Sequence, residues 1–329
     1  MRVSSMRLIV WGAAIWAFVA VCLSQAVAQD EGGKGAEEDS EQRVFIGQPD
    51  GSGMKPLVDL GEYRFQGGPV WSADGTKIAF HSYRPGRGEK DADAQIVVVN
   101  ADGSEPKILG DGGFPSFSPK HQRLVFTRYA PNPGVWVMSI EGPEKELVRI
   151  DAGWGAGRWS PDGRKIAYTT TRDMGINMYI FDLIEGDEYA VFEEGGCPYS
   201  SFFRNITWSP DGTKIAFKGQ QRGEQTSEVA IVDARGAQHG HTVRYEAKTL
   251  FNVSWNHDGT RILFCQPIAS GRMQLFSMNF NGDQAPEVLP GLDARRANIF
   301  GVVSPDGKKM LIVSRKPAVE QAKDKAKKK

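Results

Sequence analysis

The 329-residue chain has few of the residues that most often carry chemistry, and no excess of either charge. It contains three cysteines and five histidines, and its 40 basic residues equal its 40 acidic residues in number. Positions 43–315 hold 31 basic and 32 acidic residues. Nucleic-acid-binding proteins normally show a strong basic excess, so this balance argues against that class. Cys197 and Cys265 lie far apart in the repeat pattern, so we expect two separate, buried thiols.

The five histidines are too scattered for one metal centre or one acid–base site, each of which needs converging side chains. They are His81, His121, His239, His241 and His257. The H-G-H at 239–241 is a weak metal signal and is typical of a solvated hairpin tip. No G-x-S-x-G nucleophile motif occurs. Acidic residues expected on loops do not recur as a tight cluster; they are Asp111, Asp151, Asp173 and Asp293. We therefore predict no catalytic residue, no metal ligand and no cofactor.

The two ends of the chain differ from the rest. Residues 1–28 have Arg2 and Arg7, then an apolar run, then Ala26-Val27-Ala28, which is the pattern of a cleaved secretory signal peptide. An uncleaved membrane anchor is the alternative. Residues 29–42 are acidic and 316–329 are rich in lysine, and neither segment has enough apolar residues to order itself.

One short motif recurs along the remaining 43–315 segment. "WSPDG" begins at Trp159 and again at Trp208, and weaker copies begin at Trp71, Phe117, Trp255 and Val303. The intervals are 46, 42, 49, 47 and 48 residues. Such a period indicates a repeat architecture. In the second copy His121 replaces the turn glycine, so it must adopt a positive φ or remodel the turn.

Each repeat reads as four short strands in two hairpins. Continuous apolar runs such as "QIVVV" indicate strands that are covered on both faces, and small Ala79, Ala167 and Ala216 would let neighbouring sheets approach. Sheets stacked around an axis form a β-propeller. Residues 43–58 match the outer hairpin at 95–109, so they should complete the blade begun near 299–314. The sequence thus predicts an all-β, six-bladed propeller of four-stranded antiparallel blades, closed by its N-terminal strand pair.

The pattern G-x-P-x-W-S-P-D-G-x-x-I-A-F, followed by I-x-V-x-x-x-D-G, resembles the propeller repeats of the TolB family. The resemblance covers nearly the whole chain after the signal and implies the propeller fold. Related repeats occur in the propeller domains of prolyl-oligopeptidase-type enzymes. A TolB protein also carries an α/β domain before its propeller, whereas only the acidic segment precedes the first blade in this sequence. The full role of a TolB protein is therefore not implied.

The two D-G hairpin tips of each blade should lie on one face, so the longer connections collect on the opposite face. An arginine recurs there after each second strand, and aromatic residues enter from the connections. The predicted binding residues are Arg84, Arg128, Arg172, Arg222, Arg272, Tyr63, Phe114, Trp154 and Tyr199. Arginine with exposed aromatics is typical of a protein-recognition surface. The alternative is that these arginines brace the loops.

We therefore expect a non-catalytic, monomeric propeller scaffold in the periplasm or outside the cell. Its partner would be a protein or an anionic envelope component, with no nucleic acid, and with a membrane only through an uncleaved signal or a partner. The alternative is a carbohydrate-active enzyme of the polysaccharide lyase or hydrolase type.

Overall fold

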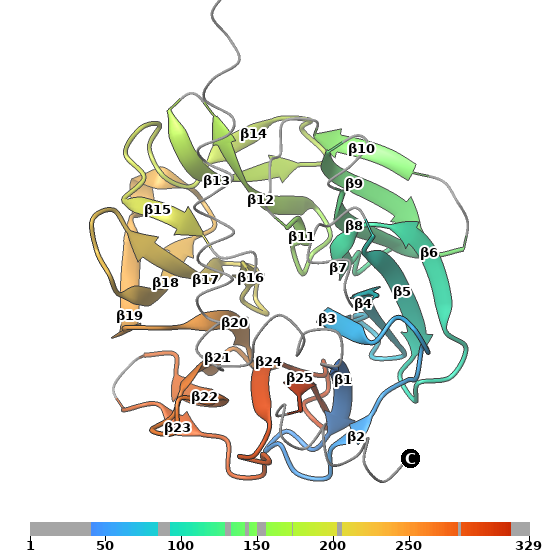
Figure 1. The fold of residues 1–329 in the computed structure, drawn as a ribbon. Coiled ribbons are helices and arrows are strands. Elements are labelled where there is room, and N and C mark those ends of the chain that lie inside the picture. Colours follow the sequence, from blue (N-terminus) through green and yellow to red (C-terminus); the bar gives the residue numbers. More distant parts are fainter. Residues whose placement is uncertain are drawn as a thin grey trace, which may run out of the picture. The chain divides into compact units, whose positions relative to one another are not determined.

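The chain folds as an all-β propeller, with its sheets arranged around a common axis (Figure 1). The computed structural model describes the following residues: 41–84, 93–128, 133–141, 145–149, 156–172, 174–202, 206–281 and 284–316. The predicted signal and nearly all of the two predicted disordered segments lie outside these residues. One short 3-10 helix, η1 (Ala237–His239), interrupts the β structure of the described part. No helix in that part is long and apolar enough to cross a membrane.

Five hydrogen-bonded sheets build the fold. The largest has eight strands in the order β24–β25–β1–β3–β4–β5–β6, with β2 paired to β1. Its strands are β1 (Gln42–Gly47), β2 (Lys55–Pro56), β3 (Phe65–Trp71), β4 (Lys77–Tyr83), β5 (Gln95–Asn100), β6 (Lys107–Asp111), β24 (Ala297–Val303) and β25 (Met310–Arg315). The β1–β3 contact is a single parallel pair, Gln42 with Phe65.

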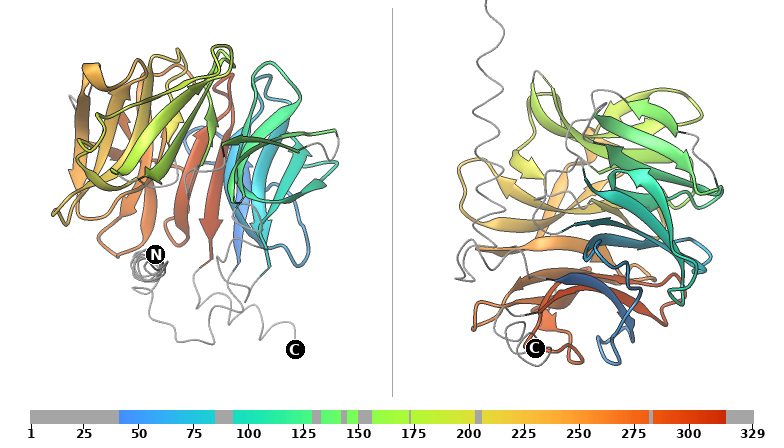
Figure 2. Two further views of the ribbon diagram at one scale, coloured as in Figure 1. Left: turned by 90° about the horizontal axis from the view of Figure 1, so that it is seen from above. Right: turned by 45° about the vertical axis from the view of Figure 1, so that its right-hand side comes forward.

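The other four sheets are antiparallel and follow one another along the chain (Figure 2). The second contains β7 (Gly113–Phe117), β8 (Arg123–Arg128), β9 (Gly134–Ser139) and β10 (Lys145–Arg149). The third contains β11 (Arg158–Trp159), β12 (Lys165–Arg172), β13 (Gly175–Asp182) and β14 (Glu188–Ala190). The fourth contains β15 (Tyr199–Phe202), β16 (Thr207–Trp208), β17 (Lys214–Gln221), β18 (Ser227–Asp233) and β19 (His241–Ala247). The fifth contains β20 (Phe251–Trp255), β21 (Arg261–Pro267), β22 (Met273–Asn279) and β23 (Glu287–Val288).

The recurring S-P-D-G sequence forms the same turn wherever it occurs. At Ser160 the hydroxyl donates to Asp162 Oδ1 at 2.6 Å and accepts from the Lys165 N–H at 2.9 Å. Gly163 closes the turn with a φ of 70°, which glycine adopts without steric cost. Non-glycine residues with positive φ in the described chain are Glu105, Phe114 and Asn252. His121 therefore remodels its turn, in which the Arg123 N–H donates to the His121 carbonyl at 2.7 Å.

Neighbouring sheets pack face to face, and the small residues predicted to permit this lie at the contacts. Ala79, Ala167 and Ala216 are fully buried, and each belongs to an apolar cluster shared with the following sheet. Conserving backbone hydrogen bonds across the junction, the Trp208 indole N–H donates to the Arg158 carbonyl at 3.1 Å. The Trp255 indole N–H donates in the same way to a carbonyl of the preceding sheet at 3.2 Å. The tryptophans of the repeat thus tie one sheet to the next.

The N-terminal hairpin pairs with the end of the chain. Strand β1 runs antiparallel to β25 from the pair Gln42–Arg315 to the pair Gly47–Met310. The side chains of Val44 and Ile46 enter an apolar cluster that also holds residues of β4, β5, β24 and β25. Residues at opposite ends of the sequence therefore share one sheet and one core. Separately, Cys197 and Cys265 are buried free thiols, as predicted.

Candidate functional site

The predicted arginines lie at one side of the propeller, which we call the loop face: the side at which the second strand of each repeat ends. Arg128 and Arg172 are the last residues of β8 and β12, and Arg84 and Arg222 directly follow β4 and β17. Arg272 lies in the connection between β21 and β22. The sequence period therefore placed this set correctly along the strands.

Arg172 is the most constrained of these arginines. Its Nη2 donates to Glu188 Oε1 at 2.8 Å and to the Tyr168 hydroxyl at 3.2 Å. Its guanidinium carbon lies 3.8 Å from the centre of the Tyr179 ring. Glu188 belongs to the outermost strand of the sheet, so Arg172 joins the second strand to the fourth. This is the geometry of a brace.

Arg84 also faces charged and aromatic neighbours of its own repeat. Its guanidinium nitrogens lie 3.7 Å from a carboxylate oxygen of Glu62 and 3.7 Å from one of Asp93. The same group stands 5.3 Å over the Tyr63 ring, which is half-buried. The predicted pairing of arginine with an aromatic residue occurs here, and it links a connection to the strand end.

The other three arginines contact neighbouring parts of the propeller as well. Arg128 stands 5.4 Å over the Trp136 ring, Arg222 Nε donates to the Cys197 carbonyl at 3.2 Å, and Arg272 Nη1 donates to the Ala294 carbonyl at 3.0 Å. Each of the five predicted arginines therefore has a contact within the protein. Arg222 is the exposed member of the set.

Tyr199 is not a surface residue, and its assignment to a binding face is wrong. The expected connection is instead strand β15, paired with β17, and the Tyr199 side chain is fully buried. Its ring packs edge-on against Phe217 with centres 5.1 Å apart, and its hydroxyl donates to Glu228 Oε2 at 3.1 Å. A Cβ on Gly219 would lie 2.4 Å from this ring. Trp154, also predicted for the binding face, lies outside the described residues.

Phe114 has an unusual backbone conformation that the sequence did not reveal. Its φ is 53°, which is costly for a bulky residue. Its N–H donates to His81 Nδ1 at 3.3 Å, and the two rings are 4.7 Å apart. Its carbonyl accepts from Arg158 Nη1 at 2.9 Å. Three different sheets thus hold this residue, which explains how the conformation persists.

The described histidines do not gather at one place, in agreement with the sequence. His81 contacts Phe114, whereas His241 contacts Tyr199 and Phe192 in the core of the fourth sheet. Within the described residues, no group of three or more histidine, cysteine, aspartate or glutamate side chains is arranged to hold a metal ion.

Glu228 is a buried carboxylic acid on strand β18. It accepts from Tyr199 and from Gln221 Nε2, and it stands directly opposite Glu246 on the neighbouring strand. Burial, together with the nearby Glu246, raises the pKa of Glu228 above its ordinary value. The folded state therefore binds a proton at this site that the unfolded state has already released.

We expect Glu228→Gln to stabilise the protein at neutral pH relative to acid pH. A raised folded pKa gives stability that is complete below the unfolded pKa and is lost as pH rises through the folded pKa. Glutamine has no such titration, so the stability difference between variant and wild type should grow as pH rises through that window. Urea unfolding at several pH values measures it, and Glu246→Gln, on an exposed partner, is the control. A difference that stays constant with pH would contradict the assignment.

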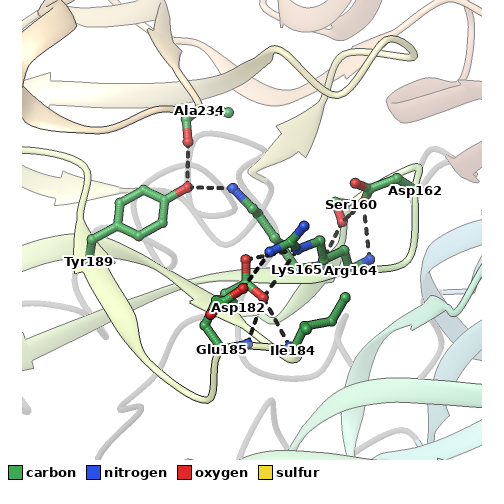
Figure 3. Close-up of polar contacts among 9 residues, drawn as sticks. All are labelled: Ser160, Asp162, Arg164, Lys165, Asp182, Ile184, Glu185, Tyr189 and Ala234. Atoms are coloured by element: carbon green, nitrogen blue, oxygen red, sulfur yellow. Dashed lines mark hydrogen bonds and ion pairs between the residues drawn. The ribbon is translucent and has the colours of Figure 1, made fainter.

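The opposite side of the propeller, which we call the tip face, carries both hairpin turns of each repeat. Figure 3 shows its polar contacts on the third sheet. Lys165 Nζ donates to the Tyr189 hydroxyl at 3.1 Å, and that hydroxyl donates to the Ala234 carbonyl at 2.7 Å. Ala234 belongs to the fourth sheet, so this chain of contacts joins two sheets at their tips.

One tip-face turn presents apolar side chains. Leu183 and Ile184, between β13 and β14, are 38% and 70% exposed. The Ile184 N–H donates to Asp182 Oδ1 at 2.9 Å, and Arg164 Nε lies 3.1 Å from the other oxygen of the same carboxylate (Figure 3). Arg164 also pairs with Glu185 at 3.0 Å. The turn is therefore held in one conformation while its apolar residues face solvent.

The fold and these two faces define an all-β propeller with candidate binding surfaces. No family model matches the sequence, and no curated protein matches it. Among solved structures, TolB from Acinetobacter baumannii is 19% identical with a TM-score of 0.58, and the match covers 91% of this chain and 70% of that one. The putative TolB from Agrobacterium tumefaciens is 18% identical with a TM-score of 0.64, covering 84% of this chain and 99% of that one.

A second kind of protein has a similar fold. Oligogalacturonate lyase from Vibrio parahaemolyticus is 14% identical with a TM-score of 0.52, and the match covers 79% of this chain and 80% of that one. The resemblance to TolB propellers that the repeats indicated is thus confirmed for the fold. At these identities the likeness concerns the fold, which unrelated activities share.

Proposed function

We propose that this protein is a non-catalytic, extracytoplasmic propeller that binds a protein partner. The observation that carries the proposal is the rigid tip-face turn with exposed Leu183 and Ile184. Apolar side chains fixed before binding cost little entropy to immobilise in a complex. Arg164 and Lys165 lie beside them, and an apolar centre with a charged rim is typical of protein interfaces. The partner should offer an apolar pocket bordered by carboxylates.

The propeller itself is proposed to span 43–315 as six four-stranded blades in a closed ring. The eight-stranded sheet contains two sets of four strands, β24–β25–β1–β2 and β3–β6, linked by one residue pair. Counted this way, the five sheets supply six blades. The β1–β25 pairing supports closure of the ring by the N-terminal hairpin.

The proposed location is the periplasm or the exterior of the cell. Its support is the signal-peptide pattern of residues 1–28. In this proposal 29–42 and 316–329 are solvated segments on either side of the propeller.

We expect replacement of Leu183 and Ile184 by aspartate to abolish partner binding while leaving the fold intact. Losing a central apolar anchor should weaken binding at least about tenfold, which corresponds to about 1.4 kcal/mol. Exposed substitutions change stability by only about 0.5 kcal/mol. Purified mature protein is used to capture partners from an envelope extract, and each captured protein is then titrated against the variants. Ile108→Asp and Val288→Asp, at other exposed apolar positions, are the matched controls.

The loop-face arginines are the second proposed location. Changing Arg84, Arg172 and Arg222 together to alanine separates the two readings. If the partner is lost while the tip-face variant binds normally, and the triple variant remains folded, the loop face is the site. If the triple variant is destabilised, mainly through Arg172, the arginines are braces. Normal binding by both variants would reject both locations.

A further inference from the structure

Two grooves on the tip face lie between neighbouring sheets. The first, the Ala234 groove, separates the third sheet from the fourth and has a volume of about 570 Å³. The second, the Ala101 groove, separates β24–β25–β1–β2 from β3–β6 and has a volume of about 670 Å³. Both volumes lie in the range of about 300 to 1,000 Å³ that is usual for ligand pockets.

The two grooves are copies of one another. In each, the first wall is a tip turn with an aspartate and a lysine, Asp162 and Lys165 or Asp306 and Lys309. In each, the second wall has a tryptophan, an aspartate and an alanine: Trp208, Asp211 and Ala234, or Trp71, Asp74 and Ala101. The repeat therefore supplies the same groups at two places.

The alanine leaves the space open. The Ala101 N–H donates to the Thr76 carbonyl at 2.8 Å, and the Ala234 N–H donates to the Thr213 carbonyl at 2.9 Å. Phe280 makes the same bond to the Thr260 carbonyl at 2.8 Å, so it occupies the corresponding position in the fifth sheet. Its ring lies 5.1 Å from the Trp255 ring and fills the space there.

Ile140 is the corresponding residue of the second sheet. Its N–H donates to the Gln122 carbonyl at 3.0 Å, and its side chain is buried in one cluster with Phe117. The fold thus accepts large side chains at this position, and the two alanines mark junctions where the chain leaves a hollow.

The groups that line the hollows include hydrogen-bond donors and acceptors in nearly equal number. Three carboxylates and three cationic side chains line the Ala234 groove, and three carboxylates and two lysines line the Ala101 groove. Serine and backbone N–H groups hold the aspartates and lower their pKa values, so they are ionised at neutral pH. Because the charges nearly cancel, a free ion gains little from entering.

We propose that the Ala101 and Ala234 grooves are binding sites for neutral saccharides. A sugar hydroxyl both donates and accepts, so adjacent hydroxyls can pair with an aspartate and a lysine at once, and such charge-assisted bonds are strong. The indole wall offers apolar surface to the C–H groups of the ring. The tryptophan is held by its indole N–H, which donates to the preceding sheet at 3.1 Å for Trp208 and at 3.4 Å for Trp71. This inference is independent of the proposed protein partner.

The experiment uses the chain's own filled junction as its guide. Ala234→Phe and Ala101→Phe should close their grooves as Phe280 closes its own, and Phe280→Ala should open a third. Glucose, galactose, mannose and N-acetylglucosamine, with their disaccharides, are titrated at millimolar concentrations while NMR follows the indole N–H signals of Trp71, Trp208 and Trp255. Because Ala234 is buried whereas Ala101 is half-buried, Ala101→Phe keeps the test available if Ala234→Phe does not fold.

We expect saturable shifts at Trp71 and Trp208 but not at Trp255 in the wild type. Ala234→Phe should remove the response of Trp208 and keep that of Trp71, and Phe280→Ala should add a response at Trp255. The proposal is overturned if no neutral sugar gives a saturable shift, or if the folded phenylalanine variants respond as the wild type does. It is also overturned if glucuronate or inorganic phosphate binds more tightly than every neutral sugar.

Discussion

Replacing residues 43–58 with a Gly/Ser segment of equal length is expected to abolish cooperative unfolding and to cause aggregation. The replacement removes β1 and β2, so the edge of β25 loses its partner over six residue pairs. It also removes Val44, Ile46 and Leu57 from a core cluster, each burial contributing about 1.5–3 kcal/mol. An unpaired edge strand is a template for association with other chains.

Size-exclusion chromatography and thermal unfolding followed by circular dichroism measure this effect. A protein lacking residues 29–40 is the control, because it keeps β1 and should unfold as the full mature chain does. A monomeric 43–58 variant with unchanged unfolding would refute the proposal that the N-terminal hairpin closes the ring.

Replacing Tyr199 with alanine is expected to destabilise the protein by about 3–5 kcal/mol, the usual cost of deleting a large buried aromatic side chain. The Tyr199 ring packs with Phe202 and Phe217, and a neighbouring strand approaches it closely because residue 219 is glycine. Loss of the ring leaves a cavity at the centre of the largest aromatic group. The free energy of unfolding in urea checks the value.

Tyr199→Phe separates the ring from the hydroxyl. It keeps the packing and removes the hydrogen bond to buried Glu228, so we expect a smaller loss of about 1–3 kcal/mol. If Tyr199→Ala proved as stable as the wild type, the residue would belong to the surface as the sequence suggested. Equal losses in both variants would place the whole effect on the hydroxyl.

Much of the fold could be predicted because the repeat writes it locally. The S-P-D-G turn depends on a serine hydroxyl, an aspartate and a glycine within four residues, and all three contacts are short-range. The likeness of 43–58 to 95–109 was enough to predict the pairing of β1 with β25, although these strands are separated by almost the whole chain. The period also placed the recurring arginines at the strand ends.

The candidate sites were less predictable. The sequence gives no sign that Tyr199 turns inward, because its burial depends on Phe202, Phe217 and the missing side chain at Gly219, which come from different strands. The conformation of Phe114 is likewise maintained by His81 and Arg158 from two other sheets. A period shows where residues recur along the chain and not which of them faces a neighbour.

What the sequence by itself determined is therefore the all-β propeller, its hairpin turns, the N- to C-terminal strand pairing and the positions of the arginines. These follow from local turn chemistry and from a pattern repeated six times. Only the tertiary structure decided that the arginines contact their own loops, that Leu183 and Ile184 face solvent on a fixed turn, and that Ala101 and Ala234 leave grooves open. Each of these depends on the volume and charge that a neighbouring sheet brings to the same place, which no single repeat encodes.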